Sequence, residues 1–387
     1  MRIIVLSIMV LSARVCSGEP TVESSQFIAD MAKSFMNSTS SDDGLESRAV
    51  FRKFESDVPQ ENRLQSLSKM WLLSKMEPDE PKVRVAILGY LIARKIYDWH
   101  ICRQLEAQIY GSINDSDNNV RRCVLNMIAR SYSYSQDRLR PSLLVFLNGK
   151  DDSIRGDAIR YMHTFRDRDR ILALYVRQHA EDNEYGNTVK PIKKFFDSQQ
   201  IKVEFDPIVN QRMVDLGVFA ESFGSDVTAR RKKAYTEFTE KIPDTKRKVA
   251  LSYMWEIANR LELSDEVRVG IVRYLLEKNI LDWYDCAELE CQIYDAGTSG
   301  KISVRSAVLE LICKTYSANA EKLCPLLFIF LTDASDDIRT YAIEQIGKLE
   351  SWEDPIRFYI DEHGANKNYL KSIAAAKHML ELNEKQK

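Results

Sequence analysis

Glycine and proline are scarce in this chain, whose 387 residues contain 14 Gly and 10 Pro. This leaves little material for the tight turns of an all-β protein or for a long disordered linker, so the composition favours helix. A charge excess of one sign is also missing, because 55 basic residues stand against 57 acidic residues and the formal net charge is −2. The chain as a whole therefore carries no field that would attract nucleic acid or an anionic membrane.

Several motifs of catalysis and metal binding are absent from the sequence. No C-x-x-C pair occurs, which removes support for zinc-ribbon or thioredoxin chemistry. Nucleophile-elbow, dinucleotide-binding and phosphate-loop strings are also missing. None of the five histidines belongs to a His-Glu pair or a His-Glu-x-x-His motif. We therefore assign no catalytic residue, no metal ligand and no cofactor from the sequence.

Long apolar runs are absent beyond the first residues. Arg2 precedes the apolar run Ile3–Leu11, which is broken only by Ser7, and small residues follow up to Gly18. Nine helical residues span about 14 Å, too short for a hydrocarbon core of about 30 Å. We interpret residues 1–18 as a cleaved signal peptide. This predicts an exported protein, secreted or periplasmic, with no transmembrane segment after cleavage; the alternative is a short N-terminal helix of a cytosolic protein.

The second half of the chain repeats the first half at a spacing of 184 residues. When Val83–Arg160 is aligned with Val267–Glu344 without a gap, 32 of the 78 pairs are identical. Self-similarity at a fixed period is typical of repeat proteins, in which each unit buries its apolar face on its neighbours. We therefore divide the mature chain into two copies, residues 19–202 and 203–387. No Gly/Ser-rich spacer occurs near 198–206, so we expect one continuous superhelix.

A shorter period lies within each copy. Val-Arg or Ile-Arg pairs begin at positions 83, 120 and 154, and again at 267, 304 and 338. Each pair opens an apolar pattern at helical spacing, and acidic or small polar residues that suit helix N-termini precede it. Other helices are expected between these, at 98–110 and 137–147 and at their copies 282–294 and 321–331. One unit is thus two antiparallel helices, and five units of about 37 residues fill one copy.

The repeated strings resemble a known helical-repeat family. Asp-Ser-Ile-Arg-x-x-Ala-Ile at 152–159 and Asp-Asp-Ile-Arg-x-x-Ala-Ile at 336–343 resemble the second-helix signature of HEAT repeats, and the strings at 80–87 and 303–309 are similar. The resemblance implies an all-α fold, a right-handed α-solenoid superhelix of about ten HEAT-like helical hairpins. It also implies that the motif arginines are structural, each pairing with an acidic residue of its own or the next unit. These arginines are Arg84, Arg121, Arg155, Arg268, Arg305 and Arg339.

Six cysteines remain if the signal peptide is removed with Cys16, and an even number in an exported protein invites disulfides. Cys102 and Cys286 are repeat equivalents, however, which suggests that each fills the same core position. We expect mostly buried free thiols. Cys313 and Cys324 are the exception, since they flank a short loop and could meet across a helical hairpin.

Histidine and tryptophan positions that repeat are interpreted as structural. His179 and His363 are equivalent and follow apolar stretches at helix ends, where they can meet C-terminal carbonyl groups. Asp98-Trp99 is reminiscent of the acidic and aromatic groups used by HEAT-like DNA glycosylases. We interpret Asp98 as a helix N-cap and Trp99 as a first-turn residue that docks the helix, because no complete site accompanies them.

The two copies differ in surface charge. Residues 121–177 contain 12 basic and 6 acidic residues, whereas the equivalent residues 305–361 contain 6 basic and 10 acidic residues. We interpret the surplus as a binding surface for an acidic partner; the alternative is a solvated face of salt bridges. The surplus arginines are Arg122, Arg130, Arg138, Arg140, Arg160, Arg166, Arg168 and Arg170.

The leading functional hypothesis is an exported, non-enzymatic scaffold that binds a protein or peptide along its helical-repeat surface. One alternative is an enzyme of an unrecognised HEAT-like class that acts on nucleic acid, a task that an export signal disfavours. Another is a structural spacer. Convergent titratable groups in a pocket would favour the enzyme, and an evenly charged surface would favour the spacer.

Overall fold

The computed structural model is helical throughout the residues that it describes. These are residues 25–38, 44–76, 81–132, 136–147, 149, 151–180, 182–199, 213–259, 264–349 and 352–385. They form twenty α-helices and seven short 3-10 turns, and this part of the chain contains no strand. The predicted all-α class is therefore confirmed. The signal peptide predicted at 1–18 lies outside the described residues, as does most of the join between the copies.

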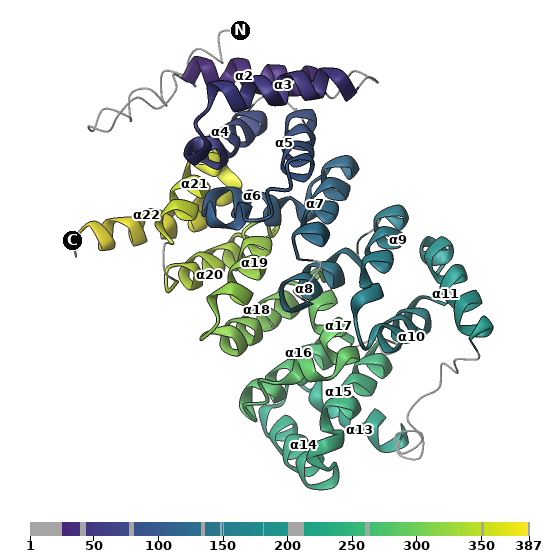
Figure 1. Cartoon of the computed structure of the whole chain (residues 1–387). Coiled ribbons are helices and arrows are strands. Elements are labelled where there is room, and N and C mark those ends of the chain that lie inside the picture. Colours follow the sequence, from purple (N-terminus) through teal and green to yellow (C-terminus); the bar gives the residue numbers. More distant parts are fainter. Residues whose placement is uncertain are drawn as a thin grey trace. The chain divides into compact units, whose positions relative to one another are not determined.

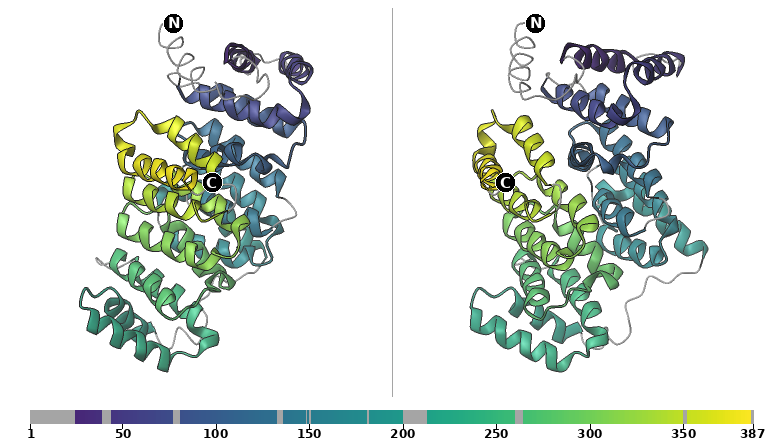
Figure 2. Two further views of the ribbon diagram at one scale, coloured as in Figure 1. Left: turned by 90° about the vertical axis from the view of Figure 1, so that its left-hand side faces the viewer. Right: turned by 60° about the vertical axis from the view of Figure 1, so that its left-hand side comes forward.

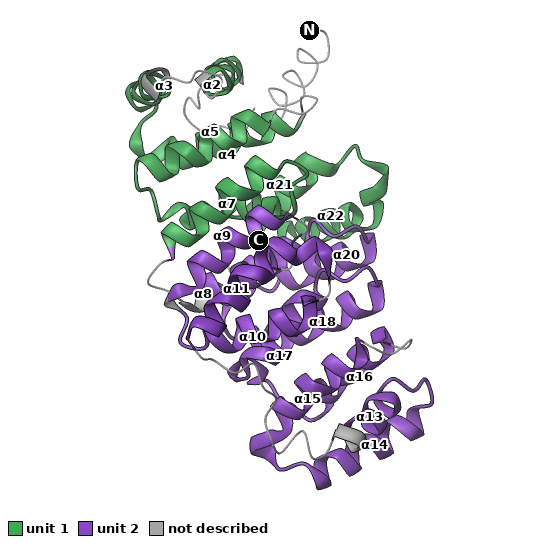
Figure 3. Cartoon of the chain, turned by 90° about the vertical axis from the view of Figure 1, so that its right-hand side faces the viewer, with its two compact units in different colours: residues 1–131, 351–387 green, residues 132–350 purple. Residues whose placement is uncertain are grey.

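The chain forms two compact units (Figure 3). Unit 1 comprises residues 1–131 and 351–387, and unit 2 comprises residues 132–350. Each unit therefore combines helices from both sequence copies. The helices of unit 1 are α2 (Ser25–Ser38), α3 (Gly44–Asp57), α4 (Arg63–Met76), α5 (Pro81–Ala93), α6 (Arg103–Gly111), α7 (Asn118–Ser131), α21 (Glu353–His363) and α22 (Leu370–Glu384). Those of unit 2 are α8 (Gln136–Leu147), α9 (Asp152–Tyr161), α10 (Arg168–His179), α11 (Gly186–Ser198), α13 (Met213–Phe223), α14 (Thr228–Lys241), α15 (Asp244–Ala258), α16 (Ser264–Glu277), α17 (Ala287–Ala296), α18 (Ile302–Tyr316), α19 (Ala320–Phe330) and α20 (Asp336–Ile346).

Helix boundaries recur at the spacing of the sequence repeat. The 3-10 turn Trp99–Ile101 returns as Trp283–Asp285, 184 residues later, and α3 returns as α14 with the same length. The residues that follow α5 and α16 are also alike: Lys95 and Asn279 have φ angles of 55° and 53°. A left-handed residue at this place ends a helix and lets its last carbonyls find partners. The duplication is thus expressed in the local backbone as well as in the sequence.

The helix predicted over 98–110 is wrong at its start. Asp98 makes no side-chain cap hydrogen bond, and Trp99–Ile101 form a 3-10 turn. Cys102 is extended, so α6 begins only at Arg103. The indole of Trp99 is fully buried, and its Nε1 donates to Oγ of Ser131 at 2.8 Å. Docking of the tryptophan, rather than a cap at Asp98, therefore fixes this segment.

Aromatic clusters hold the equivalent ends of the two copies. In unit 1 the rings of Phe35, Phe54 and Tyr90 lie edge to face, with centroids 5.3 to 6.1 Å apart. In unit 2, Phe238 and Tyr274 meet edge to face at 5.3 Å. Each such pair contributes about 0.5–1.5 kcal/mol beyond the burial of its apolar area.

The last helices of the chain complete unit 1. Helix α21 packs on α4 and α6, and the yellow helix lies beside the blue ones in Figures 1 and 2. Nζ of Lys75 in α4 lies 2.6 Å from Oε1 of Glu362 in α21. Burial would raise the pKa of Glu362, but Lys75 and His363 hold it below its ordinary value. An ion pair between segments 287 residues apart thus joins the two ends of the chain.

Unit 2 has a corresponding contact between copies. Helices α8 and α10, from the first copy, pack on α17 of the second copy, and α8 also packs on α19. Helix α10 is the repeat equivalent of α21, and α17 is the equivalent of α6. The α10–α17 packing in unit 2 therefore repeats the α21–α6 packing in unit 1, with the copies exchanged.

Candidate functional site

The motif arginines tie each helix to the loop before it. Nη1 of Arg155 donates to the carbonyl of Gly149 at 2.7 Å, and Nη1 of Arg305 donates to that of Ser299 at 2.5 Å. Both carbonyls lie six residues upstream of their arginine, and Arg339 makes the same bond to Asp333. Arg155 and Arg339 are also almost fully buried, which suits a structural role.

Five of the six motif arginines lie beside an acidic residue. Arg84 pairs with Asp115 at 3.3 Å and Arg305 with Asp333 at 2.7 Å, both from the following unit. The other three pair with an acid three residues earlier on the same helix, and Arg121 donates to the side chain of Asn118. These three pairs are Arg155–Asp152, Arg268–Asp265 and Arg339–Asp336.

The surplus arginines of the first copy do not form one site. Arg122 and Arg130 lie on α7 of unit 1, whereas the other six belong to unit 2. Arg138 lies in α8, and its side chain is outside the described residues. Arg168 stacks over the ring of Phe195 at 5.0 Å from the centroid.

Arg140 is used inside unit 2. Its Nη1 and Nη2 donate to the two carboxylate oxygens of Asp167, both at 2.7 Å, and its Nε donates to Glu290. Glu290 is only 3 % exposed, and burial raises its pKa to about 7 although the guanidinium of Arg140 lowers it. Removing one partner of a buried pair costs about 3–5 kcal/mol. Arg140 is therefore committed to the packing of α8 on α17.

Two further arginines fasten α10 to the second copy. Arg170 forms a fork with Glu288 of α17, with N–O distances of 2.9 and 2.8 Å. Arg177 forms a similar fork with Glu256 of α15, at 3.3 and 2.9 Å. The second copy has Cys324, Asp354 and Asp361 where the first copy has Arg140, Arg170 and Arg177. Much of the charge difference between the copies therefore serves their mutual contact within unit 2.

Two of the surplus arginines of unit 2 project from the connection between α9 and α10. The side chain of Arg160 is 79 % exposed although it pairs with Asp157, and Arg166 is also exposed. Their equivalents in the second copy are Glu344 and Glu350. We call residues 160–166 the cationic turn. It is the part of the predicted arginine surface that remains open for a partner.

The repeated histidines stack on tyrosine rings. His179 lies on Tyr185 with centroids 3.8 Å apart, and His363 lies on Tyr369 at 4.1 Å. Burial lowers the pKa of His179 to about 4, and Arg155 adds to this while Asp182 opposes it. The ring is thus neutral at physiological pH. These histidines pack against aromatic neighbours, which agrees with the structural interpretation from the sequence.

The six remaining cysteines are thiols rather than disulfides. Cys313 and Cys324, the pair that could have met, are both buried and unlinked. Burial raises the pKa of Cys286 to about 11 and that of Cys313 to about 12. The expectation of buried thiols is therefore confirmed for the four cysteines of the second copy, whereas Cys102 and Cys123 are half-buried.

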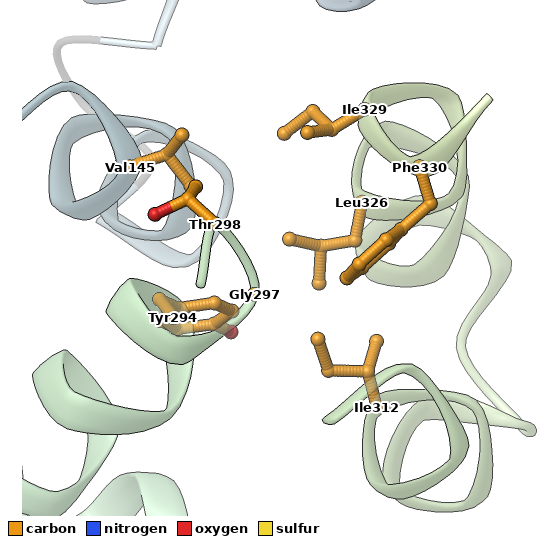
Figure 4. A pocket seen from close by; sticks show the side chains of 8 residues that line it. All are labelled: Val145, Tyr294, Gly297, Thr298, Ile312, Leu326, Ile329 and Phe330. Carbon is orange, nitrogen blue, oxygen red and sulfur yellow. The ribbon is translucent and has the colours of Figure 1, made fainter. Parts of the chain in front are cut away.

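A small apolar pocket lies in unit 2, with side chains pointing into it from two sides (Figure 4). The space open to the centre of a water-sized sphere is ≈ 20 Å³, about enough for one water, which an apolar lining does not attract. Gly297 lines this pocket at the position where the first copy has the buried Ile113. The gap is a packing difference between the copies. Its lining residues are Val145, Tyr294, Gly297, Thr298, Ile312, Leu326, Ile329 and Phe330.

Neither metal nor membrane chemistry is indicated by the described residues. They contain no group of three or more His, Cys, Asp or Glu side chains able to hold a metal ion. None of their helices combines the length and apolarity needed to cross a bilayer. The chain matches no protein-family model and no curated protein.

The buried acids were missed by sequence reasoning. Glu106 and Glu290 occupy equivalent positions in otherwise apolar runs, and each is at most 3 % exposed. Arg103 neutralises Glu106 from the same helix at 2.6 Å, whereas Glu290 relies on Arg140. An acid repeated within an apolar pattern is a readable signal of a buried ion pair, although the pattern does not name its partner.

Proposed function

We propose that the protein is an exported, non-enzymatic scaffold of HEAT-like helical hairpins that binds a protein or peptide bearing acidic groups. The proposed architecture is a right-handed superhelix of about ten hairpins in two tandem copies. Recurrence of the helix boundaries and of the motif-arginine contacts supports it. Stacked hairpins present side chains from successive helices on a common surface, which suits recognition of an extended partner.

The cationic turn carries the proposal. Arg160 and Arg166 are exposed, and the second copy has acids at both positions. Unlike Arg140 and Arg170, they make no ion pair with the second copy among the contacts described above, so their charge is available to a partner. Exposed Lys193 and Lys194 lie on α11, next to the phenylalanine on which Arg168 stacks. Guanidinium groups bind carboxylates in a fork, and local positive potential steers acidic partners toward such a surface.

The test is capture of partners from the native exported fraction by three forms of the full chain. These are the wild type, an Arg160→Glu/Arg166→Glu variant and a Lys301→Glu/Lys348→Glu control. The control reverses two exposed cations of the second copy, so both variants have the same net charge. We expect the first variant to bind the identified partner about tenfold more weakly, equivalent to about 1.4 kcal/mol. We expect the control to bind like the wild type, and binding to weaken as salt is raised.

Equal loss in both variants would assign the effect to overall charge and reject the cationic turn. Binding that survives the Arg160→Glu/Arg166→Glu change at low salt would also reject it. Arg140 and Arg170 are unsuitable targets, because their reversal would disrupt the packing of unit 2 as well.

A further inference from the structure

Helix α14 carries its charges in the order that a helix disfavours. Residues 230–233 are Arg-Arg-Lys-Lys in its first half, Glu237 and Glu240 lie in its second half, and no acid occupies its first turn. The helix dipole favours acids at the N-terminus and cations at the C-terminus. The pair Lys233–Glu237, at 3.8 Å, also has the less favourable orientation for residues four apart.

The equivalent helix of the first copy has the ordinary order. In α3 the third residue is Glu46, and Arg52 and Lys53 lie in the second half. The reversed order is therefore specific to α14 and does not follow from the duplicated fold.

The charges of α14 lie on an exposed face. Ala234, Tyr235 and Phe238 are buried, and the hydroxyl of Tyr235 donates to the carbonyl of Gly270 at 2.7 Å. The opposite stripe, at helical spacing, is exposed throughout: Ala229, Lys233, Thr236 and Glu240. Arg230 and Lys232 flank this stripe and are exposed as well. Among the described helices α14 packs chiefly on α13, and it lies at one end of unit 2 (Figure 3).

This face is complementary to itself when turned end for end. If two α14 helices lie antiparallel about the midpoint between Ala234 and Tyr235, Lys232 falls opposite Glu237 of the second helix. Arg230 and Lys233 then approach its Glu240 and Glu237, and the two helix dipoles oppose each other favourably. Val227, which is 56 % exposed before the helix, falls opposite Pro243, which is exposed after it.

We propose that two copies of this chain associate through their α14 helices, packed antiparallel in a two-fold symmetric contact. An isologous interface requires a patch that matches itself, and α14 meets that requirement in both charge and direction. A nucleic acid or an anionic membrane fits less well, because Asp226, Glu237 and Glu240 would face it beside the cations. A second α14 neutralises both ends at once.

The contact is expected to be weak and sensitive to salt. A 14-residue helix is about 21 Å long, and its exposed stripe is charged or small. Such an interface lies at the low end of specific contacts, so we expect a dissociation constant of about 10 μM or weaker at low salt. Raising the salt concentration should dissociate the dimer.

Sedimentation velocity on the full chain tests the proposal with two variants. Lys232→Glu/Lys233→Glu makes both ends of α14 acidic, and Glu237→Lys/Glu240→Lys makes both ends basic. Neither variant should self-associate, but an equimolar mixture should form a mixed dimer at least as tight as that of the wild type. The Arg160→Glu/Arg166→Glu variant is the matched control and should dimerise normally, which keeps this result separate from the proposed partner binding.

A wild type that remains monomeric at low salt and high concentration would overturn the proposal. A dimer that both variants retain, or a mixture that stays monomeric while each component is folded by circular dichroism, would overturn it too. A Thr236→Cys variant gives a second measurement, because antiparallel helices bring the two position-236 side chains together. Mild oxidation should then produce a covalent dimer, and failure to do so in a wild-type dimer would show that another surface is used.

Discussion

His179 introduces an uncharged imidazole into unit 2, between the rings of Tyr175 and Tyr185. The centroid distances are 4.9 and 3.8 Å, and burial lowers its pKa to about 4. In the unfolded chain a histidine has a pKa of about 6.5. The unfolded state therefore binds a proton between these two values that the folded state does not, and folding is linked to pH over that window.

We expect the free energy of unfolding of unit 2 to fall as the pH falls from about 6.5 to about 4, by about 1–3 kcal/mol. A His179→Phe variant should keep the aromatic stack and lose this part of the pH dependence. Urea unfolding at several pH values measures it, with His378→Gln as the control because that ring is exposed. An identical pH dependence in the His179→Phe protein would contradict the assignment.

At the scale of the element, α14 shows a helix whose stability and surface chemistry are opposed. Cations in its first half face the positive end of the helix dipole, and the residue before the helix, Val227, provides no side-chain cap. The structure keeps the helix in place through its buried aromatic face rather than through its own charges. Its polar face is therefore open to improvement.

We expect Arg230→Glu to raise the free energy of unfolding by about 0.3–1 kcal/mol, because it replaces a cation with an acid in the first turn. Urea unfolding at a protein concentration too low for self-association measures the effect. Thr236→Glu is the control, since it adds an acid in the middle of the helix, where the dipole acts weakly. A destabilised Arg230→Glu protein would mean that Arg230 makes a contact that its exposure does not suggest.

The helices themselves could be predicted from the sequence, but several contacts could not. Val-Arg and Ile-Arg pairs locate α5, α7 and α9 because burial of one helix face imposes a local period. The start of α6 was misplaced because it depends on Trp99, whose indole binds a serine 32 residues away. The partner of Arg140 lies 150 residues away, so the charge difference between the copies could indicate a basic surface without showing that part of it is internal.

For the whole molecule, sequence copies and compact units are different divisions. Unit 1 takes six helices from the first copy and α21 and α22 from the second. Its helices α4 and α6 are covered by α21, and Lys75 is neutralised by Glu362. The stability of unit 1 should therefore depend on the last residues of the chain.

We expect a chain ending at Glu350 to lose amide protection in α4 and α6, because both helices would expose apolar surface that α21 covers. Hydrogen exchange followed by mass spectrometry measures this residue by residue, and α15 to α18 of unit 2 should change little. A chain lacking only residues 385–387 is the control. Unchanged exchange in α4 and α6 of the shortened chain would show that α21 contributes little to them.

The shared membership of unit 1 also sets an order of events during synthesis. Its first segment ends at Ser131 and its second begins at Ser351, so the 219 residues of unit 2 are made between them. At roughly 5–20 residues per second, the early helices of unit 1 wait about 10–45 s for α21. Unit 2 is continuous and can finish folding first. For a chain that crosses a membrane from its N-terminus, the leading segment would then travel without its final partners, and the last helices to arrive would close the unit that began the chain.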